Sequence, residues 1–468
     1  MLVIAFEAMA VATAMPVAVR ALHGLSLYAW GFSAYLTTSL FAMVVAGEWS
    51  DRRGPREPFL GGAATFAAGL LVAGTATSMP VFVTGRAIQG LGGGMVLVAL
   101  YVVIARRYPE SLRPRVFSAI SAAWVLPSIV GPALAGWAAE QVSWRAVFLG
   151  VPPFVALAMV FVVPSLRGLG TPLDTGSDTR MDTRMDIEPA QPDVPATAAR
   201  TGRKRLALAT AAGAGLLQLA GQRLDLVGLA LGVLGAGLLV GSLPRLLPPG
   251  TLRAGRGLPT TVLERGVIGG AFFGAESFVP LMLVEQRHLS PTLAGLALTG
   301  GALGWALGSW FQGRPGLRVP RHRLVSGGAL LVAVGICGVA LTLDTRVPVA
   351  LAAPLWSVGA VGMGLLTASL SVLVLEQSAP ADQGANSAAL QLSDGLGSVL
   401  LIGLAGSVFA ALHGHDVAGH GDSTVFLAIY AVMAAVALLG AALGGRVAAP
   451  RARADARTAA LEALPDRA

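Results

Sequence analysis

Stretches of about 20 apolar residues recur along the whole chain, and this recurrence limits its fold more than any other feature. A helix needs ~20 apolar residues to cross the hydrocarbon core of a bilayer. Of the 468 residues, 54% are hydrophobic and 12% are charged, whereas soluble proteins carry about 25% charged residues. We therefore expect an all-α integral membrane protein with many spans and no separate soluble domain.

A window of ~20 residues predicts fourteen spans, arranged as six, two and six. The predicted spans lie at about 2–22, 28–47, 58–77, 80–105, 117–139, 145–165, 206–221, 224–246, 259–284, 291–312, 324–343, 348–375, 387–412 and 424–445. Segment 206–221 is short for a span. Arginine-bearing loops flank residues 206–246 on both sides, however, so both flanks should be cytoplasmic. Two spans or a re-entrant pair meet this condition, whereas a single span does not. We favour two spans.

This arrangement predicts the following organisation: an N-terminal six-helix bundle at 1–166, a disordered cytoplasmic linker at 167–205, an extra helix pair at 206–246, a cytoplasmic loop at 247–258, a C-terminal six-helix bundle at 259–445 and a cytoplasmic tail at 446–468. The linker is rich in Asp, Thr, Pro and Arg, a composition that cannot bury a core. Weak sequence similarities between the first six and the last six predicted spans suggest duplication, which is expected in transporters built from repeats.

The positive charges predict the orientation. The net charge of +8 might suggest a nucleic-acid partner, but the charges lie in loops between apolar segments, so the expected partner is the lipid bilayer and not nucleic acid. Loops on one side hold most of the arginines, which by the positive-inside rule places both termini in the cytoplasm. We expect a multi-pass protein of the inner or plasma membrane. Loop 376–386, with Glu376 and Asp382 but no basic residue, departs from this trend.

A short charged turn follows the second span, at residues 47–57. Gly47 would let helices approach closely, Gly54 permits a tight turn, and Asp51 can accept backbone N–H bonds or pair with Arg52 or Arg56 where a helix begins. The turn resembles the signature loop of the major facilitator superfamily. That resemblance implies a role in gating and conformational change, whereas the alternative is an ordinary positive-inside loop.

The match is not complete, because Trp49 replaces the usual Leu and Pro55 stands where a basic residue is usual.

Glu7 lies in the first span, nine residues before Pro16. This spacing resembles the first span of the fourteen-span drug:proton antiporters, although that family usually has Asp here and Thr where Met9 stands. Burial disfavours the charged form of a carboxyl group, so Glu7 could exchange a proton near neutral pH or meet a cationic substrate. Alternatively, Glu7 lies near the cytoplasmic surface, since six residues precede it.

Arg86 and Gln89 lie in the fourth span, in a glycine-rich segment. They resemble the Arg-Ala-x-Gln-Gly motif that the superfamily uses in proton coupling. An arginine stays charged in proteins, so Arg86 could set the protonation of a nearby acid. Snorkelling, or pairing within the bundle, is the alternative.

Gly131, Pro132 and Gly136 lie in the fifth span and resemble the antiporter motif, with Ala135 in place of one Gly and Pro127 in place of the leading Gly. Pro132 would bend the helix, and the small residues would allow tight packing against the other half. This resemblance implies export rather than uptake.

The second half offers Glu276 as a counterpart of Glu7, and Asp394 as a residue that could line the cavity. Glu264 and Arg265 are expected near the cytoplasmic end, paired or solvated. We expect no metal and no cofactor. His and Asp residues at 413–422 could in principle hold zinc, but a solvated loop is favoured.

These features together predict a monomeric, non-enzymatic exporter with the major facilitator fold: two six-helix bundles, an extra helix pair, and a cavity at mid-membrane. The expected substrates are hydrophobic or cationic small molecules, exchanged for protons by alternating access. Three alternatives stay open: a symporter that imports a small solute, a multispan membrane enzyme, and a membrane scaffold or sensor.

Overall fold

The computed structural model describes residues 2–109, 112–166, 196–221, 223, 225–314, 317–379, 382–413 and 423–448. Within these ranges the elements are helices, and no strand occurs among them. Most of the predicted linker and nearly all of the predicted tail lie outside the described residues.

The long apolar stretches form sixteen helices in the described ranges. Their bounds are α1 Leu2–Ala21, α2 Trp30–Arg53, α3 Arg56–Gly74, α4 Met79–Arg107, α5 Arg113–Ala138, α6 Trp144–Leu149, α7 Val151–Ser165, α8 Ala196–Ala220, α9 Leu226–Leu246, α10 Leu258–Glu276, α11 Val279–Gln286, α12 Pro291–Gln312, α13 Arg321–Leu341, α14 Ala352–Gln377, α15 Gln383–Leu412 and α16 Ser423–Leu443.

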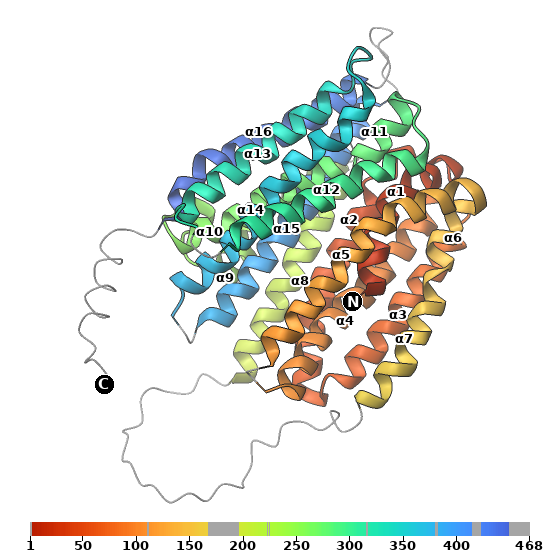
Figure 1. Cartoon of the computed structure of the whole chain (residues 1–468). Coiled ribbons are helices and arrows are strands. Elements are labelled where there is room, and N and C mark those ends of the chain that lie inside the picture. The colour runs from red at the N-terminus through yellow and green to blue at the C-terminus, as the bar shows by residue number, and fades with distance from the viewer. Residues whose placement is uncertain are drawn as a thin grey trace, which may run out of the picture.

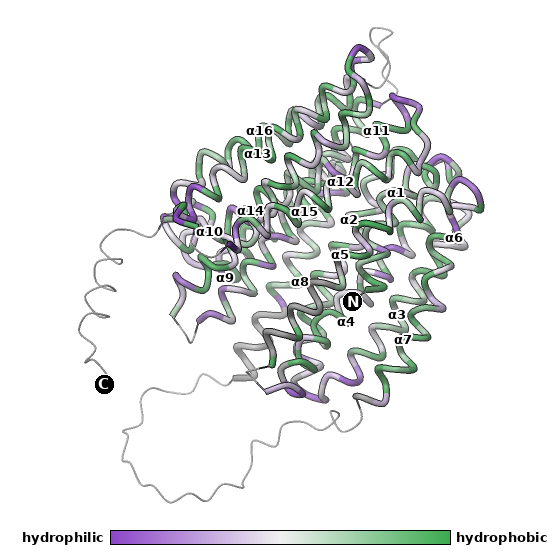
Figure 2. Tube along the Cα trace, in the orientation of Figure 1, coloured by the Kyte–Doolittle hydropathy of each residue, from purple (hydrophilic) through white to green (hydrophobic). Residues whose placement is uncertain are grey.

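Ten of the described helical segments are long and apolar enough to cross a membrane, and a bent pair raises the number to eleven. The expected count of fourteen is thus not reached by length and composition alone. Hydrophobic residues run along the helices, and hydrophilic residues gather at the turns between them (Figure 2).

Helices α1–α7 lie on one side of the molecule and α10–α16 on the other (Figure 1). The main contacts across the two sides join α5 to α12 and α2 to α15. Helix α8 lies between the two groups and packs against both α2 and α15, while α9 packs mainly against α8. The extra pair therefore contacts both sides mainly through α8.

Two predicted spans are broken. The span expected at 145–165 consists of α6 and α7, which meet at Gly150, and the segment Leu126–Leu149 is bent by 41° relative to Val151–Pro164. The span expected at 259–284 consists of α10 and α11, interrupted at Ser277 and Phe278. Prolines at the first positions of α7 and α11 suit helix starts, where the missing N–H is not needed.

The turn after the second span is shorter than expected. Helix α2 continues through Asp51 and Arg53, so only Gly54 and Pro55 separate it from α3. Gly54 has φ 80° and ψ 165°, a conformation that disfavours residues with a Cβ. Charged residues can extend a membrane helix into water, which a hydropathy window does not detect.

Helix α8 begins at Ala196, inside the stretch expected to be linker. Alanine and arginine are among the strongest helix formers, so this polar segment continues the helix beyond its apolar part.

Candidate functional site

Helix α4 supplies two of the three residues of a buried polar cluster, Arg86 and Gln89. They are three positions apart, so they share one face of the helix. The preceding residue, Gly85, lies against α3: a Cβ there would come within 2.5 Å of the Ala73 backbone nitrogen. At Gly90 a Cβ would collide with backbone atoms of α2. These close approaches hold Arg86 beside the start of α2.

Arg86 joins three helices. Its Nη1 donates hydrogen bonds to Oε1 of Glu7 in α1 and, at 2.5 Å, to Oε1 of Gln89. Its Nε donates to the Gly31 carbonyl oxygen at 2.8 Å. The guanidinium carbon lies 4.8 Å from the centre of the Tyr35 ring, a cation–π distance. Glu7 is 1% exposed, Arg86 3% and Gln89 0%. Glu7 is thus well inside the bundle, not at its surface.

The cluster is not fully satisfied. Oε2 of Glu7 and Nε2 of Gln89 are buried and have no hydrogen-bond partner within the described part of the chain. Removing one charge of a buried pair leaves the other uncompensated, which costs about 3–5 kcal/mol. A proton that binds Glu7 would remove the charge that balances Arg86. The bonds of Arg86 to Glu7 and to the Gly31 carbonyl therefore tie α1, α2 and α4 together.

Asp394 takes part in a second ion pair rather than joining the first. Its Oδ2 accepts a hydrogen bond from Nη2 of Arg265 at 3.0 Å, which links α15 to α10. The sequence predicts Arg265 to be paired or solvated but does not name Asp394 as its partner. For Glu264 the expectation of a paired or solvated position is wrong: its side chain is fully buried and neither oxygen has a partner among the described residues.

Glu276 closes α10 and belongs to neither ion pair. It is half-buried, and it lies near Trp356, whose Nε1 has no hydrogen-bond partner among the described residues. Trp356 stacks on Phe272 with ring centres 4.6 Å apart. Next to Glu276, the Ser277 carbonyl oxygen accepts a 2.6 Å hydrogen bond from Tyr28, which lies just before α2.

The loop residues of the 47–57 motif make local contacts. Arg52 pairs with Glu48 on its own helix. The Asp51 side chain lies outside the described parts, and Arg56 is exposed at the start of α3. A Cβ built on Gly47 would meet its nearest neighbour at 3.9 Å, so close packing does not require glycine there.

The three antiporter-motif positions of α5 differ in their packing. A Cβ at Gly136 would lie 2.5 Å from the Thr292 Cα of α12, so α5 and α12 touch backbone to backbone at this point. At Gly131 the nearest atom would be the Met9 Cβ, at 3.5 Å, which is ordinary contact. Pro132 lies within α5, and its carbonyl oxygen would be 2.7 Å from a Cβ on Gly295.

Some contacts were not predicted from the sequence. The Gly31 carbonyl leaves no side-chain signal, and Tyr35 is one aromatic residue among many. The pairing of Arg265 with Asp394 could have been proposed from the sequence, because opposite charges in different apolar spans tend to pair with each other.

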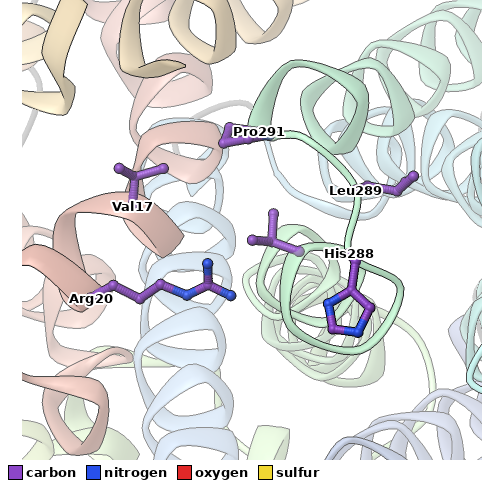
Figure 3. Close-up of a pocket in the computed structure, with 6 residues that line it drawn as sticks. Val17, Arg20, His288, Leu289 and Pro291 are labelled. Carbon is purple, nitrogen blue, oxygen red and sulfur yellow. The ribbon is translucent and has the colours of Figure 1, made fainter.

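A small cavity lies elsewhere, where α1 meets the segment between α11 and α12. Its volume is about 280 Å³, and its lining includes Val17, Arg20, His288 and Pro291. Figure 3 shows the Arg20 side chain reaching from α1 toward this cavity, with His288 on the far side. Arg20 also donates a 2.5 Å hydrogen bond from Nε to Oε1 of Glu285 in α11.

Comparison with known proteins identifies the class. The sequence pattern of the Major Facilitator Superfamily matches residues 1–275, more than half of the chain, and the protein belongs to this superfamily. It is therefore a multi-pass membrane transporter of small molecules rather than an enzyme.

Particular relatives carry more specific descriptions. A probable multidrug-efflux transporter of Mycobacterium tuberculosis is 28% identical over 425 residues, which cover 86% of this chain and 84% of the relative. A multidrug transporter protein of Bacillus subtilis is 32% identical over 164 residues, covering 35% of this chain and 30% of the relative.

Solved structures agree on the fold. A POT family transporter in complex with 5-aminolevulinic acid matches with a TM-score of 0.67 at 14% identity, covering 96% of both chains. A peptide transporter POT in complex with sulfate matches with a TM-score of 0.66 at 14% identity, covering 95% of this chain and 92% of that one. At this identity the likeness concerns the fold alone.

Proposed function

We propose that the protein is a proton-coupled exporter of hydrophobic or cationic small molecules, of the fourteen-span drug:proton antiporter type. The observation that carries this proposal is the buried Glu7–Arg86–Gln89 cluster, in which one carboxylate oxygen of Glu7 has no partner among the described residues. The efflux descriptions of the relatives in Mycobacterium tuberculosis and Bacillus subtilis support the direction.

Coupling follows from charge compensation. With Glu7 ionised, its pair with Arg86 ties α1 to α4 and so favours the arrangement seen here. When Glu7 takes up a proton, the buried Arg86 loses its counter-charge. A movement of the helices that brings Arg86 to water or to another acceptor then lowers the free energy. Protonation from the outside would thus weaken substrate binding and promote release, and deprotonation toward the cytoplasm would restore binding.

The substrate class follows from the surroundings of Glu276. Phe273 and Trp305 have ring centres 6.1 Å apart, and both are partly exposed. Phe273 lies three residues before Glu276 on α10, so the two share one face of the helix. An acid near an aromatic ring suits a lipophilic cation, because ring faces and carboxylates both attract positive charge. Glu276 would then contact the substrate while Glu7 handles the proton.

The number of spans proposed is fourteen. Four segments supplement the ten that satisfy length and hydropathy: α5, α6 with α7, α8, and α12. With an even number of spans both termini lie on one side, and the arginine-rich turns make that side the cytoplasm of the cell membrane.

With the arginine-rich turns in the cytoplasm, the structure corresponds to a state closed toward the outside. Three hydrogen bonds between the two sides lie at the end opposite the arginine-rich turns. They join Arg20 to Glu285 at 2.5 Å, Tyr28 to the Ser277 carbonyl at 2.6 Å and Thr292 to Glu140 at 2.5 Å.

The experiment is accumulation of a fluorescent lipophilic cation in intact cells that express the protein. We expect expression to lower accumulation, a protonophore to abolish the difference, and Glu7→Gln to behave like the empty vector. Asp344→Asn is the matched control, because Asp344 is exposed in the turn after α13. Accumulation that rises on expression would instead indicate an importing symporter, and an effect that survives the protonophore would rule out proton coupling.

A further inference from the structure

Helix α10 carries an acid that the proposed mechanism does not use. Glu264 is 0% exposed, and both of its carboxyl oxygens are without a hydrogen-bond partner among the described residues. Two other acids inside the helix bundles each pair with a cation: Glu7 pairs with Arg86, and Asp394 pairs with Arg265. Glu264 is the seventh residue of α10, about 9 Å along the helix from its start.

The adjacent arginine does not compensate Glu264. Successive residues of a helix point about 100° apart, and Arg265 reaches α15, where it pairs with Asp394 at 3.0 Å. Glu264 instead faces α16. A Cβ built on Gly440 would lie 3.1 Å from Oε2 of Glu264 and would collide with Ile268, one turn further along α10. The carboxyl group therefore occupies an apolar slot between α10 and α16.

Charged and titratable groups on the elements packed against α10 lie elsewhere along those elements or are engaged with other residues. They are Arg253, Glu285, Arg287, Arg321, His322, Arg323, Cys337, Glu376, Asp382, Asp394, His413, Tyr430 and Arg446, while α10 itself also carries Arg265 and Glu276. Within the described residues none of them bonds to Glu264.

A short turn covers the slot at the arginine-rich end. This covering turn, Gly444–Val447, follows α16 and is fixed by two hydrogen bonds: the Gly257 N–H donates to the Arg446 carbonyl at 2.8 Å, and Nε2 of Gln377 donates to the Val447 carbonyl at 2.8 Å. Val447 is fully buried. The covering turn packs against α10, α13 and α16, so its movement would open this end of the slot to water.

We propose that Glu264 is a second proton-binding carboxyl, which holds a proton while α10, α16 and the covering turn are packed together. An ionised carboxylate buried without a partner costs several kcal/mol, so the packed state favours the neutral acid. When the turn moves, the carboxyl releases its proton to water, and hydronium returns it before the slot closes. The inference concerns the second half of the molecule and does not depend on coupling at Glu7.

The test is infrared spectroscopy of the full chain in lipid nanodiscs at neutral pH. We expect a C=O stretching band of a protonated carboxyl in the parent and in Glu57→Gln, whose side chain is exposed, and loss of that component in Glu264→Gln. Glu264→Asp should shift the band. A parent spectrum identical to that of Glu264→Gln would overturn the proposal.

A second measurement keeps the native glutamate and so does not depend on the folding of a Glu264 variant. Deuterium exchange shifts the same band, and its rate reports access to water. We expect Gln377→Leu, which frees the covering turn, to speed the shift several-fold. Thr210→Val removes a distant 2.8 Å hydrogen bond to Ser242 and should leave the rate unchanged. Equal rates in Gln377→Leu and the parent would show that the turn does not close the slot.

Discussion

Arginine has a specific advantage at position 86. Its planar guanidinium reaches Glu7, Gln89 and the Gly31 carbonyl at once while lying near the Tyr35 ring. A lysine ammonium is a point charge on a flexible stem and cannot reproduce this fork. The residue therefore fixes the positions of three helices as well as supplying a charge.

The pair should show strong coupling in a double-mutant cycle. We expect Arg86→Met alone to destabilise the protein by about 3–5 kcal/mol, because the Glu7 carboxylate is left buried and unpaired. Glu7→Gln combined with Arg86→Met should cost clearly less than Arg86→Met alone. Unfolding in mild detergent measures both. Additive losses would mean that the two side chains do not interact in solution.

Glu276 should affect charged substrates selectively. Glu276→Gln removes a negative charge next to Trp356 but keeps the size of the side chain. We expect affinity for a lipophilic cation to fall about 10- to 100-fold, in line with the ~1.5–3 kcal/mol of a charge-assisted contact. Affinity for a neutral substrate of similar shape should not change. Equilibrium binding to the purified protein measures both. An equal loss for the two ligands would argue against direct contact.

At the residue scale, the sequence predicts the cluster only through motif resemblance. Glu7, Arg86 and Gln89 were named separately, and the structure brings them together. Composition alone could not do this, because nothing in a span of apolar residues says which face meets which neighbour. For the same reason the paired or solvated surroundings expected for Glu264 are wrong, since a distance of two turns from the helix start does not reveal whether the side chain faces water or α16.

Helix positions are predicted well at the scale of elements, because bilayer thickness demands ~20 apolar residues whatever the fold. Helix ends and breaks are predicted less well. The hydrogen-bonded helix continues into water through Arg53, and α10 stops at Glu276 within an unbroken apolar stretch. Both depend on local backbone geometry that mean hydropathy does not record.

Two glycines of α5 offer a matched comparison. Gly136→Ala would place a Cβ 2.5 Å from the Thr292 backbone, whereas Gly131→Ala meets nothing closer than 3.5 Å. Backbone atoms cannot move aside as easily as a flexible side chain can. We therefore expect Gly136→Ala to lower the free energy of unfolding by about 1–3 kcal/mol and Gly131→Ala to change it little. Thermal unfolding of the two purified variants is the measurement. Equal melting temperatures would contradict the close approach of α5 and α12.

On the scale of the whole molecule, contacts at one end hold the two sides together. Arg20 and Glu285 join α1 to α11, with side chains that are 48% and 24% exposed. Exposed pairs contribute about 0.2–1 kcal/mol, enough to shift a two-state equilibrium up to about fivefold. The pair therefore biases the transporter toward closure at this end without locking it.

Charge reversal should reveal this bias. We expect Arg20→Glu to open this end and the exchange Arg20→Glu with Glu285→Arg to restore closure. Spin labels at Ser26 and Arg346, both exposed, would report the separation in a background with Cys337→Ala. The long-distance population should rise in the single variant and fall back in the double variant. Unchanged distances would show that the pair has no influence on the conformational equilibrium.

The most direct test of the central claim is substrate-induced proton movement in proteoliposomes under an imposed pH gradient. The panel holds lipophilic cations and antibiotics, and the proteins are the parent, Glu7→Gln and the exposed control Asp344→Asn. The account predicts that a substrate moves protons in the parent and in the control, whereas Glu7→Gln still binds the substrate but moves none. Proton movement that persists in Glu7→Gln would contradict coupling through the Glu7–Arg86 pair.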